Sequence, residues 1–188
     1  MMQRDECFRI LARQITDEIV VATYSSAVEW LQTNERPLNY FSVGAMGLDS
    51  SHGLGLALGR PDRRVIVLQG DGSLLMNLGS LVTIAAAGPR NLVHLVCQNG
   101  TYEANGGHPL PGANLDFAAM ARAAGYAHVH EFSEPRNFEQ QAAHVLRQDG
   151  PVFATLHVVP TQPLTYDYAK LYDPQRRRAL KAALQRTW

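Results

Sequence analysis

Two polar side chains, Asp71 and Asn99, each follow a short apolar run of the sequence. Asp71 stands between Gly70 and Gly72 directly after residues 65–68, and Asn99 ends the next apolar run. Because ligands bind at the carboxyl ends of the strands in open α/β sheets, we expect both side chains at one such edge. A carboxylate and an amide oxygen are hard donors, which suit Mg²⁺ bound to phosphate. The pattern therefore predicts a site for a metal-bound diphosphate.

A helix should begin directly after Asp71. From Ser73 onward apolar residues recur every three or four positions, which predicts a helix over residues 73–87. Its free N–H groups would suit a phosphate, whereas Asp71 would repel one unless a cation lay between them. Gly70 and Gly72 would let the backbone turn and approach a ligand closely. A Gly-Asp-Gly run alone is an ordinary turn, so the prediction depends on the combination.

The run Gly70-Asp71-Gly72, with Gln98-Asn99 at the usual distance, resembles the metal motif of thiamine diphosphate enzymes. In that family the aspartate, the second of two asparagines and a backbone carbonyl two residues further on bind Mg²⁺. The resemblance places these roles on Asp71, Asn99 and the carbonyl of Thr101. Gln98 replaces the first asparagine, which is not the usual ligand. The implied cofactors are thiamine diphosphate and Mg²⁺.

The resemblance covers nearly the whole chain. The segment from Phe41 to Leu58 resembles the one whose glycine carbonyl receives the cofactor's amino group and whose bulky apolar residue supports the thiazolium; Gly44 and Met46 match these positions. For Met46 the alternative is an ordinary core methionine. The residues expected to contact the cofactor are Ser25, Gly44, Ala45, Met46, Gly70, Asp71, Gly72, Ser73, Asn99, Thr101 and Tyr102.

A segment rich in Gly, Asn and Pro, residues 100–109, follows the metal motif. This composition predicts a mobile loop over the cofactor and neither helix nor strand. The segment is similar to that of the sulfopyruvate decarboxylase beta subunit and of the cofactor half of phosphonopyruvate decarboxylase, although His108 replaces the commoner glutamine. Glu103 and His108 are candidate catalytic residues for proton transfer or contact with an acidic substrate; solvent-exposed loop positions are the alternative.

The resemblance implies non-oxidative decarboxylation of a small acidic 2-oxoacid. In the family, a glutamate from a separate pyrimidine-binding domain helps to activate the cofactor. No segment of this sequence resembles that domain, so we expect a hetero-oligomer in which a pyrimidine-domain alpha subunit supplies the glutamate. A non-catalytic or regulatory subunit of the same fold is the alternative. The glycine run of residues 53–59 superficially suggests a dinucleotide-binding oxidoreductase, but its spacing is wrong.

Length, charge and hydropathy favour a single-domain protein that neither binds nucleic acid nor spans a membrane. The chain has 188 residues, which suits a single domain over residues 1–188. Seventeen basic residues balance 17 acidic ones, which argues against nucleic-acid binding, and Arg176-Arg177-Arg178 should form a solvated helix face. The two cysteines, Cys7 and Cys97, cannot form a disulfide framework, and we expect a reduced, buried thiol at Cys97 and a cytoplasmic protein. No stretch approaches the ~20 apolar residues of a membrane span.

Helices and strands should alternate along the chain, in the pattern of a three-layer α/β/α fold with a mainly parallel central sheet. Helices are expected near residues 3–14, 25–31, 48–59, 73–87, 115–124, 135–148 and 174–186, and strands near 19–22, 64–69, 91–98, 126–130 and 151–159. Ser25 and Ser26 should cap the second helix, with contact to the terminal phosphate as the alternative. Structural roles are expected for His94, His128, His130 and His157; for His52, contact with the cofactor or the partner chain is the alternative.

Overall fold

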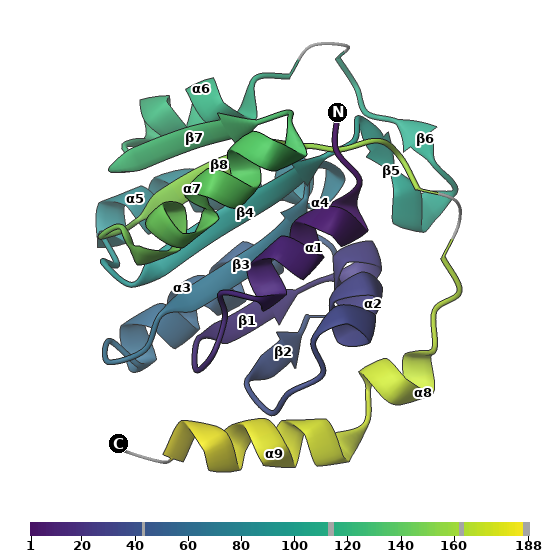
Figure 1. The fold of residues 1–188 in the computed structure, drawn as a ribbon, viewed down its shortest axis with the longest axis vertical. Helices are drawn as coiled ribbons and strands as arrows, with labels where there is room; N and C mark the ends of the chain where they lie inside the picture. Colours follow the sequence, from purple (N-terminus) through teal and green to yellow (C-terminus); the bar gives the residue numbers. More distant parts are fainter. Residues whose placement is uncertain (43, 113–114, 162–163, 186–188) are drawn as a thin grey trace.

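A six-stranded parallel sheet forms the centre of the computed structural model, which describes residues 1–42, 44–112, 115–161 and 164–185 (Figure 1). Its strands are β1 (Ile19–Ala22), β2 (Asn39–Phe41), β3 (Val65–Gly70), β4 (Leu92–Gln98), β7 (His128–Phe132) and β8 (Val152–His157). Their order is β2-β1-β3-β4-β8-β7. Since Gly70 pairs with Cys97, the residues after β3 and β4 leave the sheet at the same edge.

Helices cover both faces of this sheet. On one face lie α1 (Arg4–Ala12), α2 (Tyr24–Thr33) and α7 (Pro135–Arg147). On the other lie α3 (Asp49–Gly59), α4 (Asp71–Met76), α5 (Ser80–Ala87) and α6 (Phe117–Ala124). Successive strand residues point to opposite faces, so Val20 and Val21 belong to different cores. The predicted three-layer α/β/α fold is confirmed.

After β8 the chain continues to two further helices, α8 (Tyr168–Leu171) and α9 (Pro174–Gln185). Helix α9 lies beside β2 at the edge of the sheet (Figure 1). The Arg176 guanidinium pairs with Glu35 and stands 6.0 Å from the ring centre of Phe41. The expected solvated arginine face is therefore wrong for Arg176, although Arg177 and Arg178 are exposed.

The single helix expected over residues 73–87 is wrong, because the chain forms two helices there. α4 ends at Met76, and α5 begins at Ser80. Between them, Asn77 and Gly79 are poor helix formers. The side chain of Asn77, the C-cap of α4, also donates a hydrogen bond to the carbonyl of Gly47 at 2.7 Å.

The expected capping by Ser25 and Ser26 is also wrong, since both lie inside α2. The helix begins at Tyr24, and Thr23 occupies the cap position without a side-chain capping bond. The Thr23 hydroxyl instead donates to the carbonyl of Ser42 at 2.5 Å. The Ser25 hydroxyl lies 2.8 Å from the hydroxyl of Tyr166.

The segment after β4 contains regular structure where its composition predicted none. Strands β5 (Thr101–Tyr102) and β6 (His108–Pro109) form an antiparallel hairpin around the 3-10 turn η1 (Glu103–Asn105). Gly106 and Gly107 reverse the chain with φ of +87° and +73°, values that favour glycine. Two short strands and a 3-10 turn thus occupy the segment that was expected to be an irregular loop.

Cys97 is buried and His94 has a structural role, as the sequence predicts. Cys7 and Cys97 are free and buried. His94 is fully buried, with Nε2 2.6 Å from Gln69 and Nδ1 3.1 Å from the hydroxyl of Tyr126, as expected of a structural histidine. In the described ranges no helix is long and apolar enough to cross a membrane. Val43 and Arg186, which fall in expected segments, lie outside those ranges.

Candidate cofactor site

A pocket at the carboxyl edge of the sheet brings together segments far apart in the sequence. It spans about 370 Å³ including its open mouth. Its lining residues are Arg4, Thr23, Tyr24, Ser25, Ser26, Met46, Gly70, Asp71, Gly72, Ser73, Asn99, Thr101, Tyr102, Glu103 and Ala104. Of the residues expected to contact the cofactor, all but Gly44 and Ala45 are among them, and these two are exposed.

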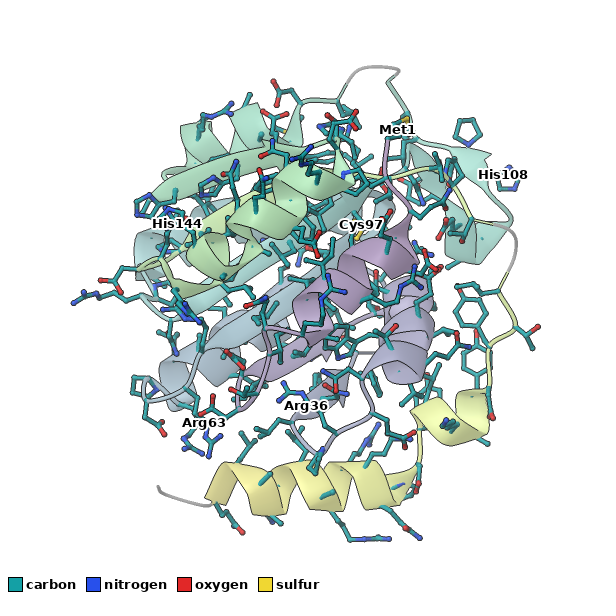
Figure 2. All side chains as sticks on the ribbon, in the orientation of Figure 1. Met1, Arg36, Arg63, Cys97, His108 and His144 are labelled. Carbon is teal, nitrogen blue, oxygen red and sulfur yellow. The ribbon has the colours of Figure 1, made fainter. Side chains whose placement is uncertain are left out.

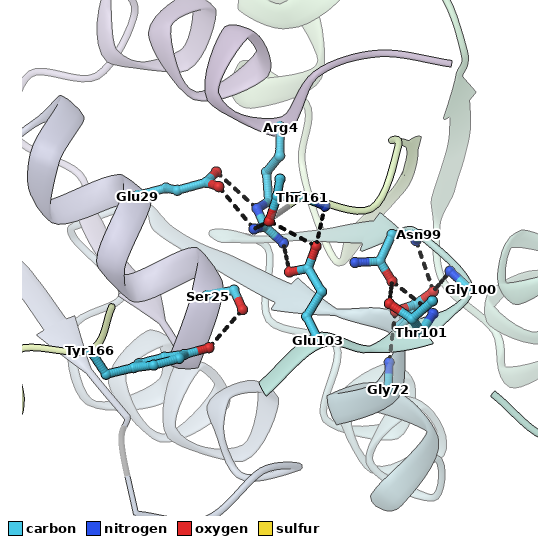
Figure 3. A network of polar contacts seen from close by, with 11 residues as sticks. Arg4, Ser25, Glu29, Gly72, Asn99, Gly100, Thr101, Glu103, Thr161 and Tyr166 are labelled. Carbon is cyan, nitrogen blue, oxygen red and sulfur yellow. Dashed lines mark hydrogen bonds and ion pairs between the residues drawn. The ribbon is translucent and has the colours of Figure 1, made fainter. Parts of the chain in front are cut away.

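Asp71 is the first residue of α4 and is buried at this edge. Its Oδ1 accepts a hydrogen bond from the N–H of Gly72 at 2.9 Å, and its Oδ2 accepts from the N–H groups of Asn99 and Gly100 at 2.9 and 2.7 Å. Figure 3 shows these donors converging from α4 and from the turn after β4. Burial raises the pKa of Asp71 to about 6, although the three hydrogen bonds oppose that rise. A bound cation would lower it again.

The oxygen atoms of Asp71, Asn99 and Thr101 are of the type that a hard cation prefers. Asn99 Oδ1 lies 2.8 Å from the N–H of Thr101 and 3.1 Å from its hydroxyl, which brings Asn99 and Thr101 together. A cation bound to Asn99 Oδ1 would displace at least one of the two hydrogen bonds that this oxygen accepts from Thr101. A carboxylate offers about four lone-pair directions, and the three hydrogen bonds of Asp71 leave one for a cation. Throughout the described part of the chain, no group of three or more His, Cys, Asp or Glu side chains could hold a metal. A metal here would therefore depend on carboxylate, amide and carbonyl oxygens.

The charges around the pocket also favour a cation. The Arg4 guanidinium contacts two carboxylates, Glu29 and Glu103, and Asp71 adds a third carboxyl group nearby. This excess of negative charge would repel a bare diphosphate. Helix α4 has only six residues, so its dipole gives less attraction than the longer expected helix. A divalent cation would have to supply most of the attraction for a diphosphate.

Two glycines shape the pocket in different ways. A Cβ at Gly70 would meet no atom within 4 Å, so the space over this residue is open to a ligand. A Cβ at Gly72 would lie 2.6 Å from the ring of Tyr102, because the ring packs directly on the start of α4. Gly70 thus leaves room, and Gly72 permits a close contact between α4 and the hairpin.

A buried polar chain lies beneath the pocket. The Ser73 hydroxyl and the Gln69 amide nitrogen lie 3.0 and 2.6 Å from Oδ1 of Asp49. The Gln69 oxygen in turn lies 2.6 Å from Nε2 of His94. Burial raises the pKa of Asp49 to about 7 and lowers that of His94 to about 3. Asp49 is completely buried. Its hydrogen bonds to Gln69 and Ser73 connect α3 to β3 and to α4.

The two candidate catalytic residues have different surroundings. Glu103 lines the pocket, but Arg4 and Thr161 occupy both of its oxygens. Burial acts to raise the pKa of Glu103, yet the charge of Arg4 and the bonds from Thr161 hold it below its usual value. His108 is exposed at the outer rim of the hairpin and does not line the pocket (Figure 2). His52 is half-buried outside the pocket lining, with Nδ1 2.9 Å from the hydroxyl of Ser42.

Sequence reasoning did not single out Arg4, Tyr24 or Thr161. Arg4 belongs to an amphipathic helix, where a buried arginine looks like a surface one. Tyr24 has a φ of +42°, which is uncommon for a residue other than glycine and occurs often at functional sites. No pattern in the sequence marks that conformation. Thr161 is brought to the site by the fold alone.

Comparison with known proteins connects this geometry to a family. Residues 21–156 match the family described as thiamine pyrophosphate enzyme, C-terminal TPP binding domain. The chain is 39% identical over 161 residues to sulfopyruvate decarboxylase subunit beta of Methanothermobacter thermautotrophicus, covering 85% of this chain and 84% of that protein. It is 40% identical over 153 residues to phosphonopyruvate decarboxylase of Streptomyces viridochromogenes, covering 81% of this chain but 38% of that protein.

The fold agrees with that of solved enzymes. Benzoylformate decarboxylase of Polynucleobacter necessarius superimposes with a TM-score of 0.73 at 22% identity, covering 86% of this chain and 34% of that one. This likeness concerns the fold alone. The sequence matches confirm the predicted family: the chain belongs to the thiamine pyrophosphate enzymes, through their C-terminal TPP-binding domain.

Proposed function

We propose that this chain is the thiamine diphosphate- and Mg²⁺-binding subunit of a two-subunit 2-oxoacid decarboxylase of the sulfopyruvate or phosphonopyruvate type. One observation carries the proposal: a single pocket gathers Asp71, Asn99 and Thr101 with Met46. The family motif assigns the first three positions to the metal that holds the diphosphate, and Met46 to the thiazolium. The similarity to a sulfopyruvate decarboxylase subunit beta over 84% of its length supports the two-subunit arrangement.

Different residues of the site would hold different parts of the cofactor. The Asp71 carboxylate, the Asn99 amide oxygen and the Thr101 carbonyl would hold Mg²⁺ and through it the diphosphate. Met46 would support the thiazolium, and the carbonyl of Gly44, an exposed residue outside the pocket lining, would receive the amino group. Ser25, Ser73 and Tyr102 line the same pocket and would contact the cofactor. When bound, thiamine diphosphate supplies the electron sink that lets a 2-oxoacid lose carbon dioxide.

The partner would be a pyrimidine-domain alpha subunit that supplies the activating glutamate. Three features support this assignment: the relatives named subunit beta, the exposed Gly44 and Ala45, and the open mouth of the pocket. His108, exposed on β6, would face the partner or the acidic tail of the substrate. Glu103 is ionised and held at both oxygens, which suits it to fixing the hairpin more than to giving a proton.

The two alternatives differ in what the site would do. A non-catalytic or regulatory subunit would bind thiamine diphosphate and Mg²⁺ through the same residues but would not turn over substrate with any partner. A dinucleotide-binding oxidoreductase is disfavoured, because the run from Gly53 to Gly59 lies inside α3 and not at a strand-to-helix turn. A Cβ at Gly53 would meet Val67 at 2.2 Å, so this glycine serves the packing of α3 on β3.

The metal assignment is tested by Asp71→Ala, which should abolish Mg²⁺-dependent binding of thiamine diphosphate. The control is Asp62→Ala, which removes an exposed carboxylate paired with Arg60 in the turn before β3. Both variants are compared with the unmodified chain by calorimetric titration after circular dichroism has established the fold. Retention of Mg²⁺-dependent binding by Asp71→Ala would refute the metal site.

The activity is tested by co-purification with a candidate pyrimidine-domain subunit and a screen of sulfopyruvate, phosphonopyruvate and simple 2-oxoacids. We expect turnover of an acidic 2-oxoacid by the complex and none by this chain alone. Full turnover by the chain alone would refute the need for a partner. Cofactor binding by a complex that turns over no 2-oxoacid would favour the non-catalytic subunit.

A further inference from the structure

Residues from both ends of the chain meet the hairpin at Glu103 (Figure 3). Oε2 of Glu103 accepts a hydrogen bond from Nη1 of Arg4, in α1, at 2.6 Å. Oε1 accepts from the N–H and the hydroxyl of Thr161, beyond β8, at 2.8 and 3.0 Å. Glu103 directly follows β5, the strand that contains Thr101. The carbonyl that would bind the metal therefore lies two residues from a carboxylate held at both oxygens.

The hairpin needs support from outside. Its strands β5 and β6 have two residues each, and isolated hairpins of that size are not stable in water. Its tip is exposed from Asn105 to Pro109. The orientation of the Thr101 peptide therefore depends on what fastens the hairpin to the body of the protein. The Tyr102 ring on Gly72 is one such contact, and the carboxylate of Glu103 makes polar contacts with Arg4 and Thr161.

The guanidinium of Arg4 is held in place by Glu29 as well as by Glu103. Its Nε and Nη2 each lie 2.9 Å from one carboxylate oxygen of Glu29 in α2, and only 2% of Arg4 is exposed. This two-point contact sets the plane of the guanidinium, which lysine could not do. Nη2 also lies 3.2 Å from the Thr161 hydroxyl, which closes the ring of contacts. Burial opposes the charge of Arg4, but Glu29 and Glu103 hold its pKa above the usual value.

We propose that Arg4 is a positioning residue for the metal, which acts through Glu103 to fix the Thr101 carbonyl, with Thr161 as the second anchor. The inference rests on the proposed function and deepens it, because Arg4 lies outside the Mg²⁺ ligands that the family motif assigns. Residues that orient the ligands of a metal typically change its affinity by about 10- to 100-fold when they are replaced.

The sign of the effect separates positioning from simple electrostatics. Arg4 carries a positive charge near the metal site, so its removal alone would strengthen the binding of a divalent cation. Positioning predicts the opposite, because the hairpin loses its anchor. Glu103→Asp gives a second test: it keeps the charge and shortens the reach by one methylene group. Arg9→Met is the matched control, since Arg9 lies in the same helix in an exposed pair with Asp5.

The experiment titrates the full chain with Mn²⁺, as a spin probe for the Mg²⁺ site, in the presence of thiamine diphosphate. Free Mn²⁺ is read by electron paramagnetic resonance, well below the unfolding temperature of each variant. We expect the dissociation constant of Mn²⁺ to rise about tenfold in Arg4→Met and Glu103→Asp and to stay unchanged in Arg9→Met. A purely structural role would lower the unfolding temperature without this change in the dissociation constant.

Each other outcome has a definite meaning. If Arg4→Met does not fold, as judged by circular dichroism, Glu103→Asp decides the question. Unchanged Mn²⁺ binding in Glu103→Asp, or tighter binding in Arg4→Met, overturns the positioning role while leaving the proposed function intact. If the unmodified chain with thiamine diphosphate binds no Mn²⁺, the proposed function fails and this inference fails with it.

Discussion

The hydroxyl of Ser73 accepts a hydrogen bond from the backbone N–H of Gly47 at 2.8 Å. Asn77, the residue directly after α4, donates to the carbonyl of the same glycine at 2.7 Å, so the residue that follows Met46 is held by α4 and by its C-cap. The first residue of that helix is Asp71. One short helix therefore sets the separation between the candidate metal ligand and the residue expected to support the thiazolium.

Ser73→Ala should impair turnover more than cofactor binding. The substitution leaves the Gly47 N–H without its acceptor, a loss of about 1–3 kcal/mol for a buried donor, and frees the Met46 turn. We expect turnover of the reconstituted complex to fall about tenfold, while the affinity for Mg²⁺ stays within about twofold. Ser80→Ala is the control, because Ser80 bonds Ser50 at 2.9 Å and joins α3 to α5 outside the pocket lining. Equal losses in both variants would contradict the role of Ser73.

Stability should fall with rising pH through the titration of Asp49. Burial raises its pKa from 3.8 to about 7, so between these values the folded state holds the proton that the unfolded state has lost. The free energy of unfolding must then decrease as the pH rises through this window. Each pKa unit is worth about 1.4 kcal/mol, which makes the expected decrease a few kcal/mol. Denaturant unfolding near pH 5 and near pH 8 measures it.

Asp49→Asn tests the origin of that pH dependence. Asparagine keeps an oxygen for the bonds from Ser73 and Gln69 but has no proton to lose in this range. The difference in unfolding free energy between the two pH values should therefore shrink markedly. An exposed carboxylate in α7, Glu139, provides the control as Glu139→Gln. If Asp49→Asn keeps the full pH dependence, another group must cause it.

Much of the fold and of the residues that gather in the candidate site could be predicted from local patterns. The apolar runs that end before Asp71 and Asn99 are strands β3 and β4, and parallel pairing puts their ends at one edge whatever the rest of the chain does. The family motif added Met46, which lines the same pocket. These predictions succeed because each depends on a few neighbouring residues.

The remaining features depend on contacts between distant residues. Nothing near Glu103 in the sequence indicates that Arg4, 99 positions away, occupies its carboxylate. The residue after α4, Asn77, bonds the carbonyl of Gly47, a contact between distant residues that periodicity cannot detect. The sequence predicts that Arg176 is exposed. Instead it pairs with Glu35, because α9 lies beside β2, and this placement depends on the tertiary fold.

Gly53 and Gly55 should respond to alanine in opposite directions, although both lie in α3. A Cβ at Gly53 would meet Val67 at 2.2 Å, so Gly53→Ala must push α3 away from β3 and should destabilise the protein by about 1–3 kcal/mol. A Cβ at Gly55 would meet nothing within 4 Å, so Gly55→Ala should stabilise the helix by about 0.5–1 kcal/mol. Thermal unfolding of both variants checks this, and destabilisation by Gly55→Ala would contradict it.

Mg²⁺ binding should weaken as the pH falls below the pKa of Asp71. Burial places that pKa near 6, and a protonated carboxyl group is a poor ligand for a hard cation, so binding below this pH must displace a proton. The affinity should then fall about tenfold for each pH unit below 6 and level off above it. Phosphate groups also take up protons near pH 6, so Mg²⁺ titrated into free thiamine diphosphate supplies the baseline. After that correction, an affinity independent of pH between about 5 and 8 would exclude Asp71 as the ligand, because a carboxyl group with a pKa near 6 must lose its proton before it binds the metal at pH 5.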